Sequence, residues 1–189
     1  MNWFYFQNIE ELLISEYGEK DYRKIVAHAG IEEEYFISNN TYPDDYCLKL
    51  ASSTANIAKK DIHQVQFSFG YYWYKATNNI LRNSLMMGAN RLKPLLQQLP
   101  EIFARFNIQF PFMNQMKLEI SELSSKSIII SYHFPGQIAQ ESYFQGFLNA
   151  LGDLYKEKIC IDLIQPQNDT AEKAIFRVQW LWWNPHPTP

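Results

Sequence analysis

The sequence predicts an α+β fold, in which helices are followed by a four-stranded antiparallel sheet packed against helices. Three observations predict it. Apolar residues recur every three or four positions up to about residue 106, as on one face of a helix. Beyond that point the apolar period changes to two, which is typical of half-buried strands. Short connections between the later strands favour antiparallel pairing.

The helices are expected in the first part of the chain. Glycine readily adopts the left-handed conformation that ends a helix, so Gly18 and Gly30 are expected to end the first two. Asp61 is expected to start the fourth. A further apolar helical region begins near Leu81, and Pro100 is expected to tilt its last turns, because proline lacks an N–H and clashes with the preceding turn. The expected ranges are 7–17, 21–29, a helix opening at 41–45, one from 61, and the region 81–106.

The strands are expected after residue 115. Four runs of alternating or continuous apolar residues predict them, and an amphipathic helix over 138–156 separates the second from the third. The strand ranges are 116–120, 127–132, 159–163 and 175–180. We expect a single domain over 1–189, with a helical lobe at about 1–60, a helix and sheet lobe at 61–183, and a tail at 184–189.

Composition narrows the class of protein. Apolar residues make up 47% and charged residues 20% of the 189 residues, which indicates an ordered globular chain with a sizeable core. The net charge of −3 argues against a nucleic-acid binder that depends on bulk positive charge. The sequence has no apolar run long enough to span a membrane. Cys47 and Cys160 are far apart and show no paired spacing, which fits a reducing, cytoplasmic location.

The sequence offers no motif for catalysis or metal binding. Its histidines, His28, His63, His133 and His186, show no metal-ligand spacing. Nucleophile-elbow, phosphate-loop and dinucleotide-binding motifs are absent as well. We therefore expect neither an enzyme nor a metal centre, and no catalytic residue.

Four segments of the chain, in this order and spacing, resemble the heme nitric oxide/oxygen-binding (H-NOX, or HNOB) family. They are Ile9–Gly18, Ala29–Ser38, Thr41–Asp45 and Phe69–Trp73. The resemblance covers roughly residues 5–180. It implies a helical N-terminal lobe and a C-terminal lobe with a four-stranded antiparallel sheet, with heme between them. It also implies that ligand binding alters a separate partner, of the histidine kinase or cyclase type.

The residues that bind heme in the family do not carry over. Phe103 stands where the resemblance implies the iron-ligating histidine. In the family's Tyr-x-Ser-x-Arg motif for the heme propionates, Tyr132 matches, but Phe134 and Gly136 replace the serine and arginine. Phenylalanine has no lone pair for iron, and glycine has no charge for a propionate. The resemblance thus points to a stand-alone, bacterial-type member that lacks the proximal histidine.

Three functions remain open. The first is a heme-free sensor that signals through a separate partner and holds an apolar small molecule in a pocket between the lobes, lined by Phe103, Tyr132, Phe134 and Gly136. The second is a nitric oxide or oxygen sensor that still binds heme, with unusual iron ligation. His133 is the nearest replacement ligand, although a strand neighbour of Tyr132 should point to the opposite face. The third is a regulatory domain that only contacts proteins and whose cavity is filled by its own side chains.

Overall fold

The computed structural model describes residues 3–32, 35–37, 40, 42–43, 45–76, 89–109, 117–133, 141–168 and 171–181. The chain divides into two compact units. The first comprises Met1–Asn78 and Ser142–Phe147, and the second comprises Asn79–Glu141 and Leu148–Pro189. The helix after Asp61 therefore belongs to the first unit, whereas the division expected from the sequence placed it with the sheet.

The first unit is helical. It contains α1 (Trp3–His28), α2 (Tyr46–Ala58), α3 (Ile62–Ala76) and the first part of α6 (Glu141–Leu154). Its core holds a cluster of aromatic rings: Phe6 stacks on Phe36 with ring centroids 4.9 Å apart, and Tyr42 meets Phe36 edge-on at 5.0 Å. Such pairs bury large apolar areas, so they fix the segment around residue 36 against α1.

The ends of these helices follow the sequence signals in most places. Gly18 interrupts α1 with a positive φ of 79° and non-helical ψ, and Gly30 follows its end with φ 66°. The carboxylate of Asp61 accepts hydrogen bonds from the backbone N–H groups of His63 (2.8 Å) and Gln64 (3.3 Å), which caps α3. Asp45 occupies the N-cap position of α2 without a side-chain capping bond, and its carboxylate pairs with Lys49 at 2.8 Å instead.

The second unit contains a four-stranded antiparallel sheet in the order β1-β2-β4-β3. Its strands are β1 (Lys117–Ser124), β2 (Ser127–His133), β3 (Ile159–Gln165) and β4 (Ala174–Trp180). Side chains alternate along β2 and β4, so every second residue is buried. This confirms the predicted sheet. β1 runs four residues beyond the predicted Ile120, because its pairing with β2 continues to a tight turn at residues 125–126.

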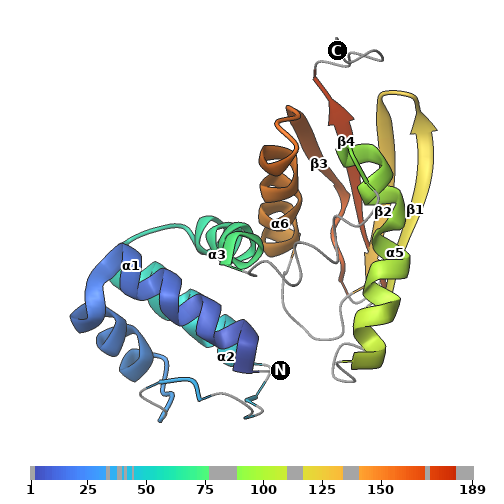
Figure 1. Ribbon diagram of the computed structural model, residues 1–189. Coiled ribbons are helices and arrows are strands. Elements are labelled where there is room, and N and C mark those ends of the chain that lie inside the picture. The colour runs from blue at the N-terminus through green and yellow to red at the C-terminus, as the bar shows by residue number, and fades with distance from the viewer. Residues whose placement is uncertain are drawn as a thin grey trace. The chain divides into compact units, whose positions relative to one another are not determined.

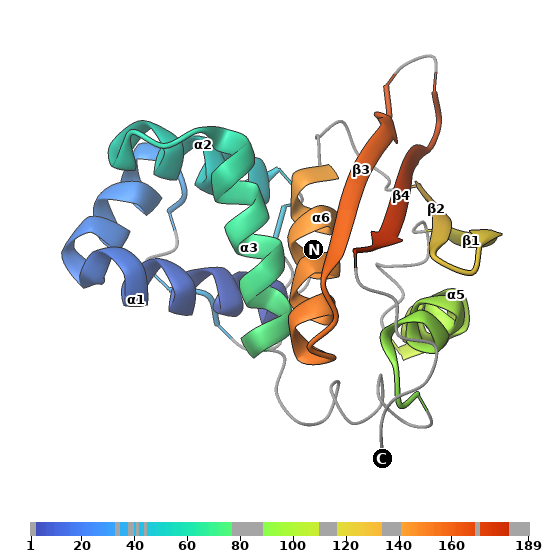
Figure 2. The ribbon, with the colours of Figure 1, turned by 90° about the horizontal axis from the view of Figure 1, so that it is seen from above.

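Two of the described helices accompany this sheet. α5 (Leu92–Gln109) lies in front of β1 and β2 in Figure 1, and α6 lies beside β3; Figure 2 shows the same neighbours from above. Glu157 ties the start of α5 to the sheet, since its carboxylate accepts the Leu92 N–H at 3.2 Å and the Trp180 indole N–H at 2.5 Å. α5 continues through Pro100 as one helix to Gln109. The predicted helical residues from Leu81 to Gly88 lie outside the described residues.

Candidate functional site

Phe103 lies on the buried face of α5. The buried side chains of this helix follow the three-and-four spacing of a single face: Leu92, Leu95, Leu96, Leu99 and Phe103. Phe103 is 7% exposed, so its ring is removed from water together with these leucines. A phenyl ring at this place contributes apolar contact and has no lone pair to offer a metal.

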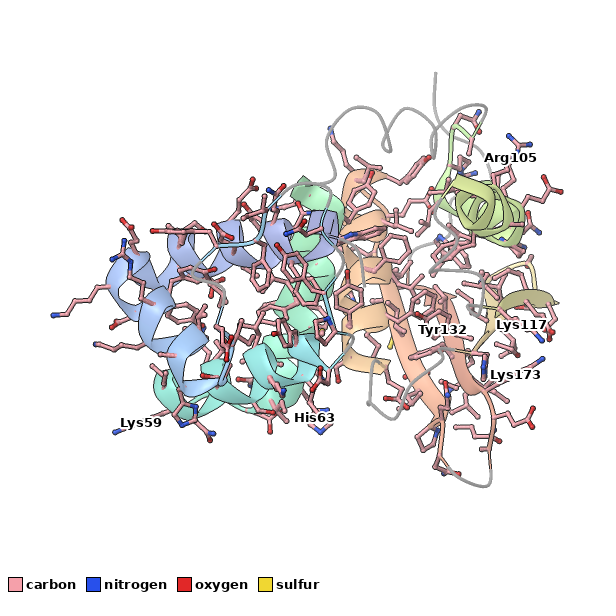
Figure 3. The ribbon with its side chains drawn as sticks, turned by 90° about the horizontal axis from the view of Figure 1, so that it is seen from below. Lys59, His63, Arg105, Lys117, Tyr132 and Lys173 are labelled. Carbon is pink, nitrogen blue, oxygen red and sulfur yellow. The ribbon has the colours of Figure 1, made fainter. Side chains whose placement is uncertain are left out.

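Tyr132 lies on the buried face of the sheet. In the β-ladder it pairs with Leu118 of β1 and with Ala174 of β4, which share its face of the sheet and are buried with it. Tyr132 is 3% exposed. Figure 3 shows it in the interior, whereas Lys117 and Lys173 lie at the periphery. Because the side chain of Ala174 is small, it leaves room for the larger ring of Tyr132 on the neighbouring strand β2.

Glu141 is a buried carboxylate in the first turn of α6. It is 9% exposed, and its Oε1 accepts a hydrogen bond from the backbone N–H of Gln167 at 3.0 Å. Burial, and secondly the charge of Glu141, raise the pKa of Tyr132 well above its usual value, so the phenol stays protonated. Glu141 is not among the site residues predicted from the sequence. An acidic residue in the first turn of a helix was the available signal, but it ordinarily indicates only a favourable helix dipole.

His133 points away from this buried face. It follows Tyr132 on β2, so alternation sends its side chain to the opposite side of the sheet, as predicted. The side chain is partly exposed there. Its Nδ1 lies 2.5 Å from the carbonyl oxygen of Glu172, which can only accept a hydrogen bond, so Nδ1 carries the proton. His63 lies in the first unit and meets the Ser142 hydroxyl at 3.1 Å.

The remaining predicted site residues, Phe134 and Gly136, lie outside the described residues, as does His186. In the described part of the chain, no three His, Cys, Asp or Glu side chains gather as a metal site. Within the same residues, no helix is both long and apolar enough to cross a membrane.

A heme at the position implied by the resemblance would require suitable side chains on α5 and on the strand that carries Tyr132. Heme iron needs a side chain with a lone pair, and heme propionates need cations or hydrogen-bond donors. Among the described buried residues of α5 and of the inner sheet face there is no histidine, lysine or arginine. The carboxylate of Glu141 adds negative charge beside Tyr132. Phe103 therefore does not fit the role of an iron ligand, and of the implied propionate motif the described residue Tyr132 supplies a hydroxyl donor without a positive charge.

Comparison with solved structures defines the class of this fold. An H-NOX mutant from T. tengcongensis matches with a TM-score of 0.82 and 15% identity, covering 96% of this chain and 98% of that one. An H-NOX protein from S. oneidensis, a mutant in the Fe(II) ligation state, matches with a TM-score of 0.83 and 13% identity, covering 95% and 96%. The fold is thus that of an H-NOX domain.

The family follows from the sequence itself. The family model for haem-NO-binding proteins (HNOB) matches residues 4–163. The chain belongs to this haem-NO-binding family, which confirms the resemblance. A comparison with curated protein sequences finds no match.

Proposed function

We propose that this H-NOX domain is a cytoplasmic sensory domain that does not bind heme, holds an apolar small molecule instead, and signals through a separate partner protein. It performs no catalysis of its own. The ligand lies against α5 and the strand that carries Tyr132. Family resemblance is the basis for a partner of the histidine kinase or cyclase type.

The observation that carries this proposal is the buried phenyl ring of Phe103 on α5. The resemblance places the family's iron ligand at this residue. A heme seated here would meet a hydrocarbon ring on the iron and the charge of Glu141 near Tyr132, where the family binds propionates. Both features oppose heme, and both favour an uncharged occupant.

The competing function is heme binding through His133. Within the described residues its Nδ1 is the ring atom that makes a hydrogen bond, to the Glu172 carbonyl, so Nε2 is the atom that would bind a metal. The strand, however, directs this side chain away from the face that buries Tyr132. Reaching a heme on the Tyr132 face would require β2 to shift by one residue, which would also turn the buried Ile128 and Ile130 outward.

A visible spectrum of the protein, expressed with added heme precursor and iron, separates these functions. We expect no Soret band at one heme per chain. A stoichiometric Soret band that disappears in His133→Ala would contradict the proposal and establish ligation by His133. His63→Ala is the matched control, because His63 is an exposed histidine of the first unit.

Mass spectrometry of the solvent-extracted protein then separates a ligand-holding domain from one with a filled cavity. We expect an apolar molecule that copurifies with the folded chain and is absent after purification under denaturing conditions. Recovery of no such molecule from the native protein would favour the third function, a regulatory domain that only contacts proteins.

A further inference from the structure

The connection between β3 and β4 brings Glu141 and Tyr132 to the same end of the sheet. Gln167, whose N–H binds the Glu141 carboxylate at 3.0 Å, lies two residues beyond β3. On the returning strand, Ala174 is the cross-strand partner of Tyr132. A single short connection therefore holds the carboxylate from one side and lines the tyrosine from the other.

This arrangement gives the protein an internal anion at the place where the resemblance implies the carboxylate of a ligand. Glu141 and Tyr132 are both buried, so water screens the charge of Glu141 weakly there. The effect on Tyr132 agrees, because the nearby charge disfavours formation of a second anion on the phenol. A ligand carboxylate beside Tyr132 would meet the same repulsion.

We propose that Glu141 is a specificity-determining residue, which makes the Tyr132 site select uncharged amphipathic ligands over carboxylic acids. The ligand class is an apolar chain or ring system with a neutral polar end, such as a primary amide or an alcohol. The Tyr132 hydroxyl is the hydrogen-bonding group for that end. This inference rests on the proposed function and makes it specific, since it names the chemistry of the occupant.

The test uses the full chain and two fluorescent probes that differ only in their end group, a dansyl-labelled undecanoic acid and its uncharged primary amide. At about pH 8 the acid is ionised. We expect the wild-type protein to bind the amide about tenfold more tightly than the acid, and Glu141→Gln to bring the two affinities within about twofold of each other. Glutamine keeps an oxygen that can accept the Gln167 N–H, so the variant retains that contact.

Glu172→Gln is the matched control, since it removes the same charge from an exposed side chain on the same connection. Only the backbone carbonyl of Glu172 binds His133, so this contact also survives. The control should keep the wild-type preference for the amide. Comparing the two probes within each variant cancels any general loss of folded protein.

The outcomes separate the inference from the proposed function. Equal affinity for acid and amide in the wild type, or a preference that survives in Glu141→Gln, would overturn the role of Glu141 and leave the ligand-holding domain intact. Binding of neither probe by any variant would overturn the inference together with the pocket. The heme spectrum independently tests whether the domain is heme-free.

Discussion

At the residue scale, Phe103 is an apolar residue at the position where the resemblance implies an iron ligand. Its side chain is buried on α5. Substituting Phe103→His therefore adds a lone pair but leaves the propionate positions, Phe134 and Gly136, without hydroxyl or charge. We expect this single variant to bind heme weakly in a hemin titration.

The triple variant Phe103→His, Phe134→Ser, Gly136→Arg restores all three family positions. One charge-assisted contact between a guanidinium and a propionate contributes roughly 1.5–3 kcal/mol, or about one to two decades in affinity. We expect the triple variant to bind hemin more tightly than the single variant by about this factor. Equal affinities in the two titrations would show that residues 132–136 are not the propionate site.

Glu10 on α1 predicts a pH-dependent stability of the first unit. Burial raises the pKa of this carboxyl above its usual value, although its Oε2 accepts the Phe36 N–H at 2.9 Å. The folded state then holds the proton more tightly than the unfolded state. Ionisation of Glu10 therefore lowers the free energy of unfolding as pH rises from the unfolded-state pKa through the higher folded-state pKa. We expect Glu10→Gln to be more stable than the wild type at neutral pH, and the difference to vanish under acid conditions.

Urea unfolding at both pH values measures this difference. Glu19→Gln is the control of opposite sign, because hydrogen bonds from Tyr35 and Arg23 lower the pKa of Glu19. Its stabilising contribution is present at neutral pH and is lost as pH falls, so this variant should be less stable than the wild type only at neutral pH. A Glu10→Gln variant that is less stable at neutral pH would contradict the argument.

At the scale of elements, the contact between α3 and the first part of α6 depends on two glycines. A Cβ atom added to Gly70 would lie 1.8 Å from the carbonyl oxygen of Tyr143, and one added to Gly146 would lie 2.0 Å from that of Phe67. Both obstacles are backbone atoms, which cannot rotate away. The two helices therefore pack backbone to backbone, and any side chain at either position would force them apart.

We expect Gly70→Ala or Gly146→Ala to destabilise the protein by about 3 kcal/mol or more, at the upper end of overpacking effects. Urea unfolding monitored by circular dichroism measures this loss. Gly152→Ala is the matched control on the same helix, because its two nearest neighbours are side-chain atoms of Ile159 at 3.0 Å, which can move, and the closest backbone atom, the Glu157 carbonyl oxygen, lies 3.2 Å away instead of 1.8–2.0 Å. A loss as large in Gly152→Ala as in Gly146→Ala would show that helix position, and not the close contact, causes the effect.

At the scale of the whole molecule, heme binding to the folded state must increase the free energy of unfolding. A ligand that binds only the folded state stabilises it by about 2.7 kcal/mol at one hundred times its dissociation constant, which raises the melting temperature by roughly 5–10 °C in a chain of this size. We expect excess hemin to leave the melting temperature of the wild type unchanged. The triple variant should show the increase, which makes it the positive control for the same measurement.

The sequence by itself determined the elements and the family. Apolar spacing of three and four residues predicted the helices of the first unit and α5, and alternation predicted the strands. Gly18 and Gly30 indicated where the N-terminal helices are interrupted or end. These signals suffice because they depend only on local backbone preference and on which face meets the core. The order of the four segments was sufficient to identify the family that the comparisons confirm. Alternation also predicted that Tyr132 and His133 would face opposite sides of the sheet.

Only the tertiary structure decided which distant residues meet. Glu141 reaches Gln167, Glu157 reaches Leu92 and Trp180, and Gly70 touches the backbone at Tyr143, although no spacing in the sequence relates these partners. An acid in a first turn or a glycine within a helix is compatible with many surroundings. Its effect depends on the burial and charge that folding brings beside it, so the selectivity proposed for Tyr132 could be derived only once Glu141 was placed near it.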